Sequence, residues 1–203
     1  MGMKMRRVPI AKVIGTIIAA GILIFGALVY KLLFGGIPEV HNSSRQYGNW
    51  ENFAGYSGLK IFPRDISKES IREYYYRSQD TIFSPEAQVF LEAVFEKDAF
   101  EQEVERLSHI CMSDGKETNL VLEDNRHFPA VAYICEYNWN HCYEYALVFP
   151  EALKINYIFL QNIDAADAAF EDSLLPEGYG EESEENPYCL YAFGTGKNVI
   201  WYE

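Results

Sequence analysis

Residues Val13 to Tyr30 form an uninterrupted run without a charged side chain, VIGTIIAAGILIFGALVY. A helix of these eighteen residues, at about 1.5 Å of rise per residue, nearly spans the ~30 Å hydrocarbon core of a bilayer. We therefore predict a short basic N-terminus over residues 1–12 and a transmembrane helix over residues 13–34. The chain would reach the cytoplasmic membrane through this helix.

Basic residues flank this run unevenly. Lys4, Arg6, Arg7 and Lys12 precede it, whereas only Lys31 follows it closely. Since positive charge near a membrane helix favours the cytoplasmic side, the sequence predicts a single-pass protein of the cell membrane with a cytoplasmic N-terminus. Everything after about residue 36 would then lie outside.

A cleaved signal peptide is the alternative interpretation of the same segment. Signal peptidase prefers small residues at the last and third-last positions before the cut. A cut after Gly36 puts Phe34 at the third-last position, and a cut after Gly21 leaves a short apolar core. The sequence favours an uncleaved anchor, and the signal peptide stays open as the alternative.

Charge is distributed very unevenly along the chain. The first 31 residues carry five bases and no acid, and the remainder carries 12 bases and 30 acids, a net charge of −18. Such a surface repels phosphate backbones, which argues against nucleic acid as a partner. It would attract basic proteins or cations, or it serves solubility alone.

The outer part has the length of one domain. Residues 35–55 are rich in Pro, Gly, Asn and Ser and predict a stalk, which leaves residues 56–203 for an extracytoplasmic domain. A second polar stretch, residues 171–187, predicts a mobile surface loop.

The dominant sequence pattern in the domain is an alternation of side-chain character with a period of two residues, which is typical of β-strands. β-Branched and aromatic residues at 131–137, 142–149 and 155–160 predict three successive antiparallel strands. Further strands are predicted at 59–62, 70–77 and 199–202. The fold class that follows is α+β, a mainly antiparallel sheet with one covering helix behind the membrane anchor.

Residues 84–110 are ambiguous. Apolar residues at every second position predict a strand over 87–95, and Asp98 with Glu101 predicts a capping box that starts a separate helix over 98–110. Its core stripe would be Phe100, Val104, Leu107 and Cys111. One long helix from Pro85 is the alternative.

Four cysteines fall on the predicted outer side, where disulfides persist. Cys135 and Cys142 flank a hairpin tip and could bond across it, which leaves Cys111 with Cys189. Buried thiols are the alternative. No CxxC or HExxH spacing supports a metal site, and no cofactor motif is present.

Aromatic residues are unusually frequent, with 28 among the 167 residues after Gly36. Exposed tyrosines and tryptophans suit contact with sugars or protein surfaces. The candidates for such a binding face are Tyr74, Tyr75, Tyr76, Trp139, Tyr143 and Tyr145. The alternative is that these rings fill the core of the sheet.

Several segments resemble uncharacterised secreted or single-pass membrane proteins of Gram-positive anaerobic bacteria. These segments are LKIFP at 59–63, REYYYRS at 72–78, FEQEVERL at 100–107, AYICEYN and YEYAL within 132–147, INYIFLQ at 155–161 and LLPEGY at 174–179. No activity is attached to that group, so the resemblance implies location and regular structure only.

No nucleophile elbow or metal-ligand spacing commits the chain to a reaction. The sequence favours a membrane-anchored binding or interaction domain with a protein or glycan partner outside the cell. The alternative is a membrane-tethered hydrolase that acts on wall or surface substrates through paired carboxylates, which need no short motif.

Overall fold

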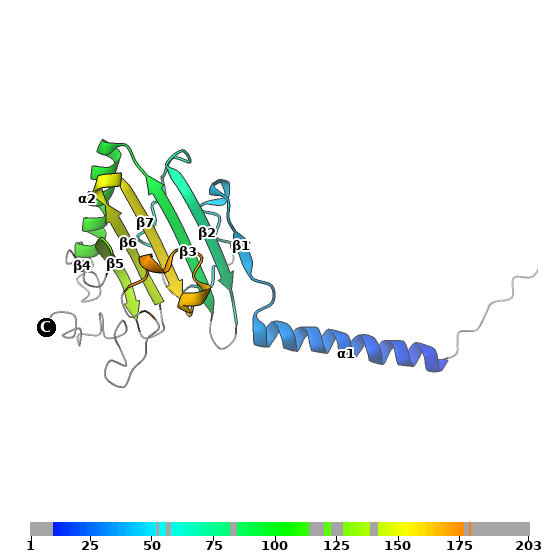
Figure 1. The fold of residues 1–203 in the computed structure, drawn as a ribbon. Coiled ribbons are helices and arrows are strands. Elements are labelled where there is room, and N and C mark those ends of the chain that lie inside the picture. The colour runs from blue at the N-terminus through cyan, green and yellow to red at the C-terminus, as the bar shows by residue number, and fades with distance from the viewer. Residues whose placement is uncertain are drawn as a thin grey trace, which may run out of the picture.

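The computed structural model describes residues 10–51, 53–55, 58–81, 85–113, 120–122, 128–138, 142–176 and 179. Within them, one antiparallel sheet with strand order β1-β2-β3-β7-β6-β5-β4 stands beside two α-helices (Figure 1). The α+β class predicted from the sequence is confirmed. The strands are β1 Glu39–His41, β2 Ile71–Gln79, β3 Glu86–Val94, β4 Leu120–Leu122, β5 Val131–Asn138, β6 Cys142–Phe149 and β7 Lys154–Gln161.

The strands predicted from alternation are present at 70–77, 87–95, 131–137, 142–149 and 155–160. β5, β6 and β7 follow one another as antiparallel neighbours. β7 also pairs with β3, with Phe90 opposite Ile158, so this last strand lies in the middle of the sheet. The sheet therefore joins segments that are far apart in the chain.

Helix α2, Lys97–Ser113, follows β3 directly, which confirms the separate strand and helix and rules out one long helix. Phe100 and Leu107 are buried and Val104 is partly buried, as the predicted stripe requires. The helix begins one residue before Asp98, so Asp98 lies in its first turn and does not cap it. The side chain of Cys111 is outside the described residues.

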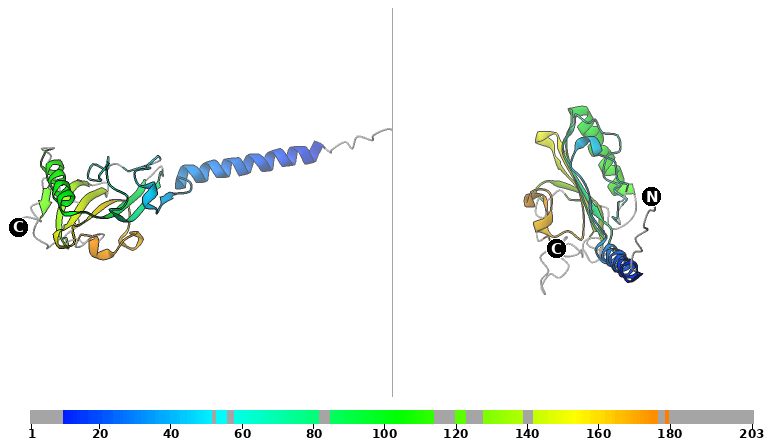
Figure 2. Two further views of the ribbon diagram at one scale, coloured as in Figure 1. Left: turned by 90° about the horizontal axis from the view of Figure 1, so that it is seen from above. Right: turned by 90° about the vertical axis from the view of Figure 1, so that its right-hand side faces the viewer.

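Alternation along the strands sends side chains to two faces, and both faces are covered (Figure 2). We call the face under α2 the helix face and the opposite one the far face. Residues 44–66 complete the cover of the helix face, and residues 163–175 cover the far face. The core is therefore two apolar layers with the sheet between them.

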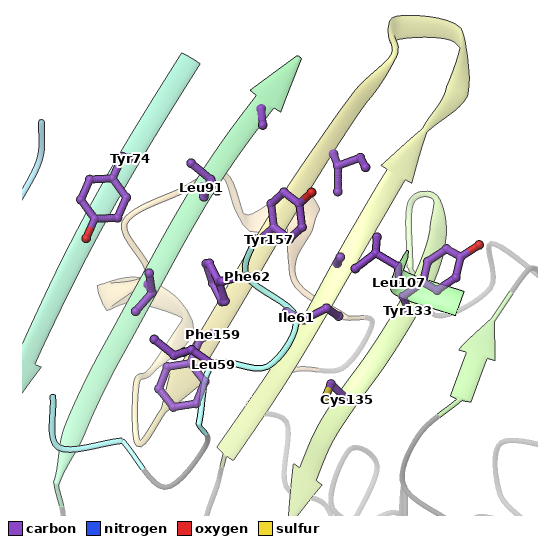
Figure 3. Packing of buried hydrophobic residues seen from close by; sticks show 14 of the residues in the cluster. Leu59, Ile61, Phe62, Tyr74, Leu91, Leu107, Tyr133, Cys135, Tyr157 and Phe159 are labelled. Carbon is purple, nitrogen blue, oxygen red and sulfur yellow. The ribbon is translucent and has the colours of Figure 1, made fainter. Parts of the chain in front are cut away.

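Residues 59–62 are not a strand, contrary to the prediction. They cross the helix face as an irregular segment, with Leu59, Ile61 and Phe62 buried over β7 and β6 (Figure 3). Leu59 has a φ of 50°. Such a left-handed residue does not fit a regular ladder, which is why this apolar segment packs on the sheet without joining it.

Two other segment predictions change. Part of the expected stalk, residues 35–55, belongs to the domain, because β1 pairs with β2 and Tyr47, Trp50 and Phe53 pack against the helix-face core. The described part of the loop expected at 171–187 contains a short helical turn and buries Leu175 in the far-face core. The strand expected at 199–202 lies outside the described residues.

Helix α1, Ile10–Phe34, leaves the domain next to β1 (Figure 1). Within it, Lys12–Lys31 is long and apolar enough to cross a membrane, and none of this span is buried against the rest of the protein. Its large side chains are open to the surroundings; Leu23 is 73% exposed and Phe25 is 70% exposed. The helix expected over 13–34 is therefore present.

Candidate functional site

The tyrosines predicted to form one exposed binding face do not do so. Tyr74 and Tyr76 are buried on the helix face, Tyr143 and Tyr145 are buried on the far face, and Tyr75 is partly buried on the far face. Trp139 lies outside the described residues. Because both faces are covered, these rings fill the two cores, as the alternative interpretation held.

The hydroxyls of Tyr74 and Tyr145 fasten covering segments to the sheet. Trp50 Nε1 donates a hydrogen bond to the Tyr74 hydroxyl at 3.0 Å. The Tyr145 hydroxyl donates to the carbonyl of Leu174 at 3.0 Å. Burial is the main cause that raises the pKa of Tyr74 to about 12. The polar tips of these rings are therefore used within the fold.

Cys135 and Cys142 are not the cross-strand neighbours that the hairpin suggested. The β5–β6 register places Cys142 opposite Asn138, three residues from Cys135, and a bulge between Ile134 and Glu136 interrupts the ladder. Both cysteines are buried thiols in the helix-face core. The disulfide prediction is therefore wrong for this pair, and Cys189 lies outside the described residues.

A polar cluster lies between α2 and the sheet. Glu103 accepts hydrogen bonds from Arg106 Nε at 2.7 Å and from the Tyr157 hydroxyl at 2.6 Å. Arg106 Nη2 also donates to the carbonyl of Ile61 at 2.6 Å. Burial and the adjacent Glu103 carboxylate raise the pKa of Tyr157 well above its ordinary value. This cluster binds α2, β7 and the 59–62 segment together.

Glu144 is a fully buried carboxylate on the same face. Its Oε1 accepts a hydrogen bond from the Ile61 backbone N–H at 2.7 Å. Both backbone polar groups of Ile61 are thus held, the N–H by Glu144 and the carbonyl by Arg106. Glu103 and Glu144 therefore both bind groups inside the fold, so neither supports the paired-carboxylate hydrolase.

Asn156 is a buried polar residue in the central strand. It is fully buried on the far face, and neither its Oδ1 nor its Nδ2 has a hydrogen-bond partner among the described residues. It stands opposite Glu92, which forms an ion pair with Lys154 at 3.0 Å. A buried amide without partners is costly, so Asn156 weakens the sheet at this point.

The junction between α1 and the domain is closely packed. Gly35 has a φ of +69° and lies so close to the backbone of Asp80 that a Cβ at this position would overlap the Asp80 carbonyl. Gln79 Nε2 donates a hydrogen bond to the Gly36 carbonyl at 3.0 Å. The end of α1 is therefore fixed against Gln79 and Asp80, at the end of β2.

A second cluster fastens β1 beside this junction. The Glu39 carboxylate lies 3.1 Å from His41 Nε2 and accepts a longer hydrogen bond of 3.4 Å from the Tyr76 hydroxyl. The His41 ring stacks on Tyr76 with centroids 5.0 Å apart, and burial of Tyr76 raises its pKa to about 12. His41 Nδ1 is buried and has no hydrogen-bond partner in the described part of the chain. A strand of three residues is thus held by side chains as well as by its ladder.

The outward side of this junction is apolar. Ile37 is 94% exposed and Val40 is 47% exposed. Val40 alternates with Glu39 and His41, whose side chains point to the helix face, so it projects to the other side of β1. Sequence reasoning assigned both residues to a stalk and missed them. The junction of α1, β1 and the end of β2 is the candidate functional site.

Among the described residues, no group of three or more His, Cys, Asp or Glu is arranged to hold a metal ion. No family model, curated protein or solved structure matches the chain. The resemblance to proteins of Gram-positive anaerobes therefore stays a prediction, and the function must be argued from the geometry.

Proposed function

We propose that this chain is a single-pass membrane protein whose α+β domain lies outside the cytoplasm and serves as a binding or interaction domain. The observation that carries the proposal is α1. It presents a 20-residue apolar span, Lys12–Lys31, of which no part is buried by the domain. Exposed to water, such a surface would be strongly unfavourable, and a bilayer removes that cost.

The basic flank supports the orientation. Four bases precede the uncharged run that begins at Val13, and the part of the chain after Lys31 has a net charge of −18. Positive residues stay on the cytoplasmic side during insertion, so the acidic domain would be the translocated part.

The packed junction supports an anchor that is retained. A cut after Gly36 would remove both the Gly35 contact with Asp80 and the hydrogen bond from Gln79 to the Gly36 carbonyl, and a cut before Gly36 would still remove the Gly35 contact. A signal peptide that is discarded has no need of a specific contact with the mature domain. The end of α1 behaves as an element of the fold.

Binding is favoured over catalysis because of where the reactive groups lie. The carboxylates and tyrosine hydroxyls described at the helix face are hydrogen-bonded to neighbouring elements of the domain. An acidic outer domain held at a membrane is suited to a cationic protein or to a glycan that it meets at the cell surface.

Three measurements test the topology. Intact-mass analysis of the membrane-bound protein should show residues 1–36 retained, and protease added to intact cells should degrade the domain. The double variant Ile17→Asp, Ile22→Asp should be released from membranes at alkaline pH, because each central acid costs about 2.5–3.5 kcal/mol on insertion. The matched control is Ile17→Leu, Ile22→Leu. A processed chain, or a domain that resists protease in intact cells, would refute the proposal.

The interaction role needs its own experiment. Crosslinking in intact cells, followed by detergent extraction and capture through a C-terminal tag, should recover a reproducible protein or glycan partner. The released Ile17→Asp, Ile22→Asp protein is the control, since it should lose partners that are met only at the membrane. Recovery of the same background from both proteins would contradict a membrane-surface binding role.

A further inference from the structure

The direction in which α1 leaves the domain orders the strands relative to the membrane. α1 extends away from the β1 edge of the sheet, and the two views agree on this (Figures 1 and 2). β4 lies at the other edge. If α1 crosses the bilayer, β1 is the strand nearest to the lipid and β4 is the farthest.

The spacing between α1 and β1 is too short for a stalk. α1 ends at Phe34 and β1 begins at Glu39. Four residues lie between them, and two of these, Gly35 and Gly36, are held by Asp80 and Gln79. The domain is therefore attached directly and at a defined angle to the helix.

The side chains that face outward at this edge match a lipid interface. Ile37 and Val40 are apolar and exposed, and Lys31 and Arg45 are exposed bases near them in the chain. Apolar side chains with flanking bases are typical of segments that lie at the boundary between headgroups and acyl chains. The acidic residue beside Val40, Glu39, does not face the lipid, because its carboxylate is turned inward to His41 and Tyr76.

We infer that the β1 edge is a membrane-contact surface, formed by Ile37 and Val40, and that its occupant is the interface of the same bilayer that holds α1. This inference rests on the proposed anchor. The contact follows because β1 begins only four residues after the end of α1, and the packed junction fixes the angle between α1 and the sheet. The domain then rests on the membrane, with its successive strands at increasing distance from the lipid.

Quenching by brominated lipids tests this contact in the full-length protein. The protein is reconstituted into phosphatidylcholine vesicles that contain lipids brominated near the headgroup end of the acyl chain. Single tryptophans are added as Val40→Trp, Ile37→Trp, Phe25→Trp and Glu101→Trp, and each added signal is obtained by difference from the parent protein. Glu101 is exposed on α2 and serves as the distant control.

The expected result is loss of fluorescence for Val40→Trp, Ile37→Trp and Phe25→Trp, and none for Glu101→Trp. Quenching of Phe25→Trp without quenching of Val40→Trp would overturn the membrane contact and leave the anchor intact. Absence of quenching at Phe25→Trp would overturn the anchor itself. If the Val40→Trp fluorescence were protected from the brominated lipids only at high protein concentration, this edge would be assigned to a second copy of the chain. That result would also overturn the inference.

Discussion

Replacing Gly35 by alanine should loosen the domain from α1, and Gly36 provides a matched control. Both glycines have positive φ, +69° and +81°. An added Cβ at Gly35 would overlap the Asp80 carbonyl, whereas at Gly36 no atom lies within 4 Å. The two substitutions therefore share the backbone strain, and only Gly35→Ala adds the collision.

The size of each effect follows from these contacts. An alanine with positive φ costs roughly 1 kcal/mol relative to glycine. Relief of the collision at Gly35 requires the end of α1 to move from Asp80, which also breaks the hydrogen bond from Gln79 to Gly36, worth about 1 kcal/mol. We expect a cost of about 1 kcal/mol for Gly36→Ala and about 2 kcal/mol or more for Gly35→Ala.

Amide hydrogen exchange in lipid nanodiscs measures these costs locally. Free energies of about 1 and 2 kcal/mol correspond to roughly 5-fold and 30-fold faster exchange in the β1–β2 ladder. Exchange in β7, which lies in the centre of the sheet, should not change in either variant. Equal acceleration by the two substitutions would refute the claim that close packing at Gly35 fixes the helix.

Three further predictions concern the domain, and the midpoint of urea unfolding measures each. Glu144→Ala should lower stability by about 3 kcal/mol, because it leaves the Ile61 N–H buried without a partner and opens a cavity; an unchanged midpoint would contradict the role of this carboxylate. Asn156→Leu should raise stability by about 1 kcal/mol or more, since it removes two unsatisfied buried atoms, and a loss would show that the amide has a partner. The pKa of Tyr74 is raised from 10 to about 12, so the folded state binds the hydroxyl proton more tightly than the unfolded state does. The stabilisation from this difference is complete below pH 10 and is lost as the pH rises from 10 to 12. Tyr74→Phe should therefore flatten the decline of stability over that range.

Local patterns predicted most of the sheet. The strands at 131–137, 142–149 and 155–160 are rich in β-branched or aromatic residues and are separated by short turn-forming segments. Both signals can be recognised within a window of a few residues. The division of residues 84–110 into a strand and a helix was predicted for the same reason. The sequence also contained the apolar run of α1 in full.

Residues 59–62 show why the remaining predictions failed. Their alternation resembles a strand, yet the N–H and carbonyl of Ile61 bind Glu144 and Arg106, which lie 83 and 45 residues away. Partners at such a distance leave no local pattern. The cysteine prediction failed in a similar way, since the β5–β6 register and its bulge decide which residues face each other.

The aromatic prediction failed because it depended on how the sheet is covered. A sheet with one covering helix would leave one face open, and some of the tyrosines would then be exposed. Residues 163–175, which carry no strong helical or strand pattern, cover that second face. Tyr143 and Tyr145 are buried for this reason, and neighbouring residues such as Tyr74 and Tyr75 point to opposite faces.

The same covering restricts where a partner can bind. Both faces of the sheet are occupied, and α1 extends from the β1 edge. Of the described elements, α2 lies on the side away from α1, against β4 and β5 (Figure 1). Its outer surface carries exposed carboxylates at Glu101 and Glu105, each weakly paired within the helix. Surface pairs of this kind contribute little to stability, so these charges are available to attract a cationic partner that approaches from outside. A partner captured in intact cells should therefore be lost at high ionic strength, whereas a partner that stays bound in concentrated salt must use an apolar surface elsewhere in the domain.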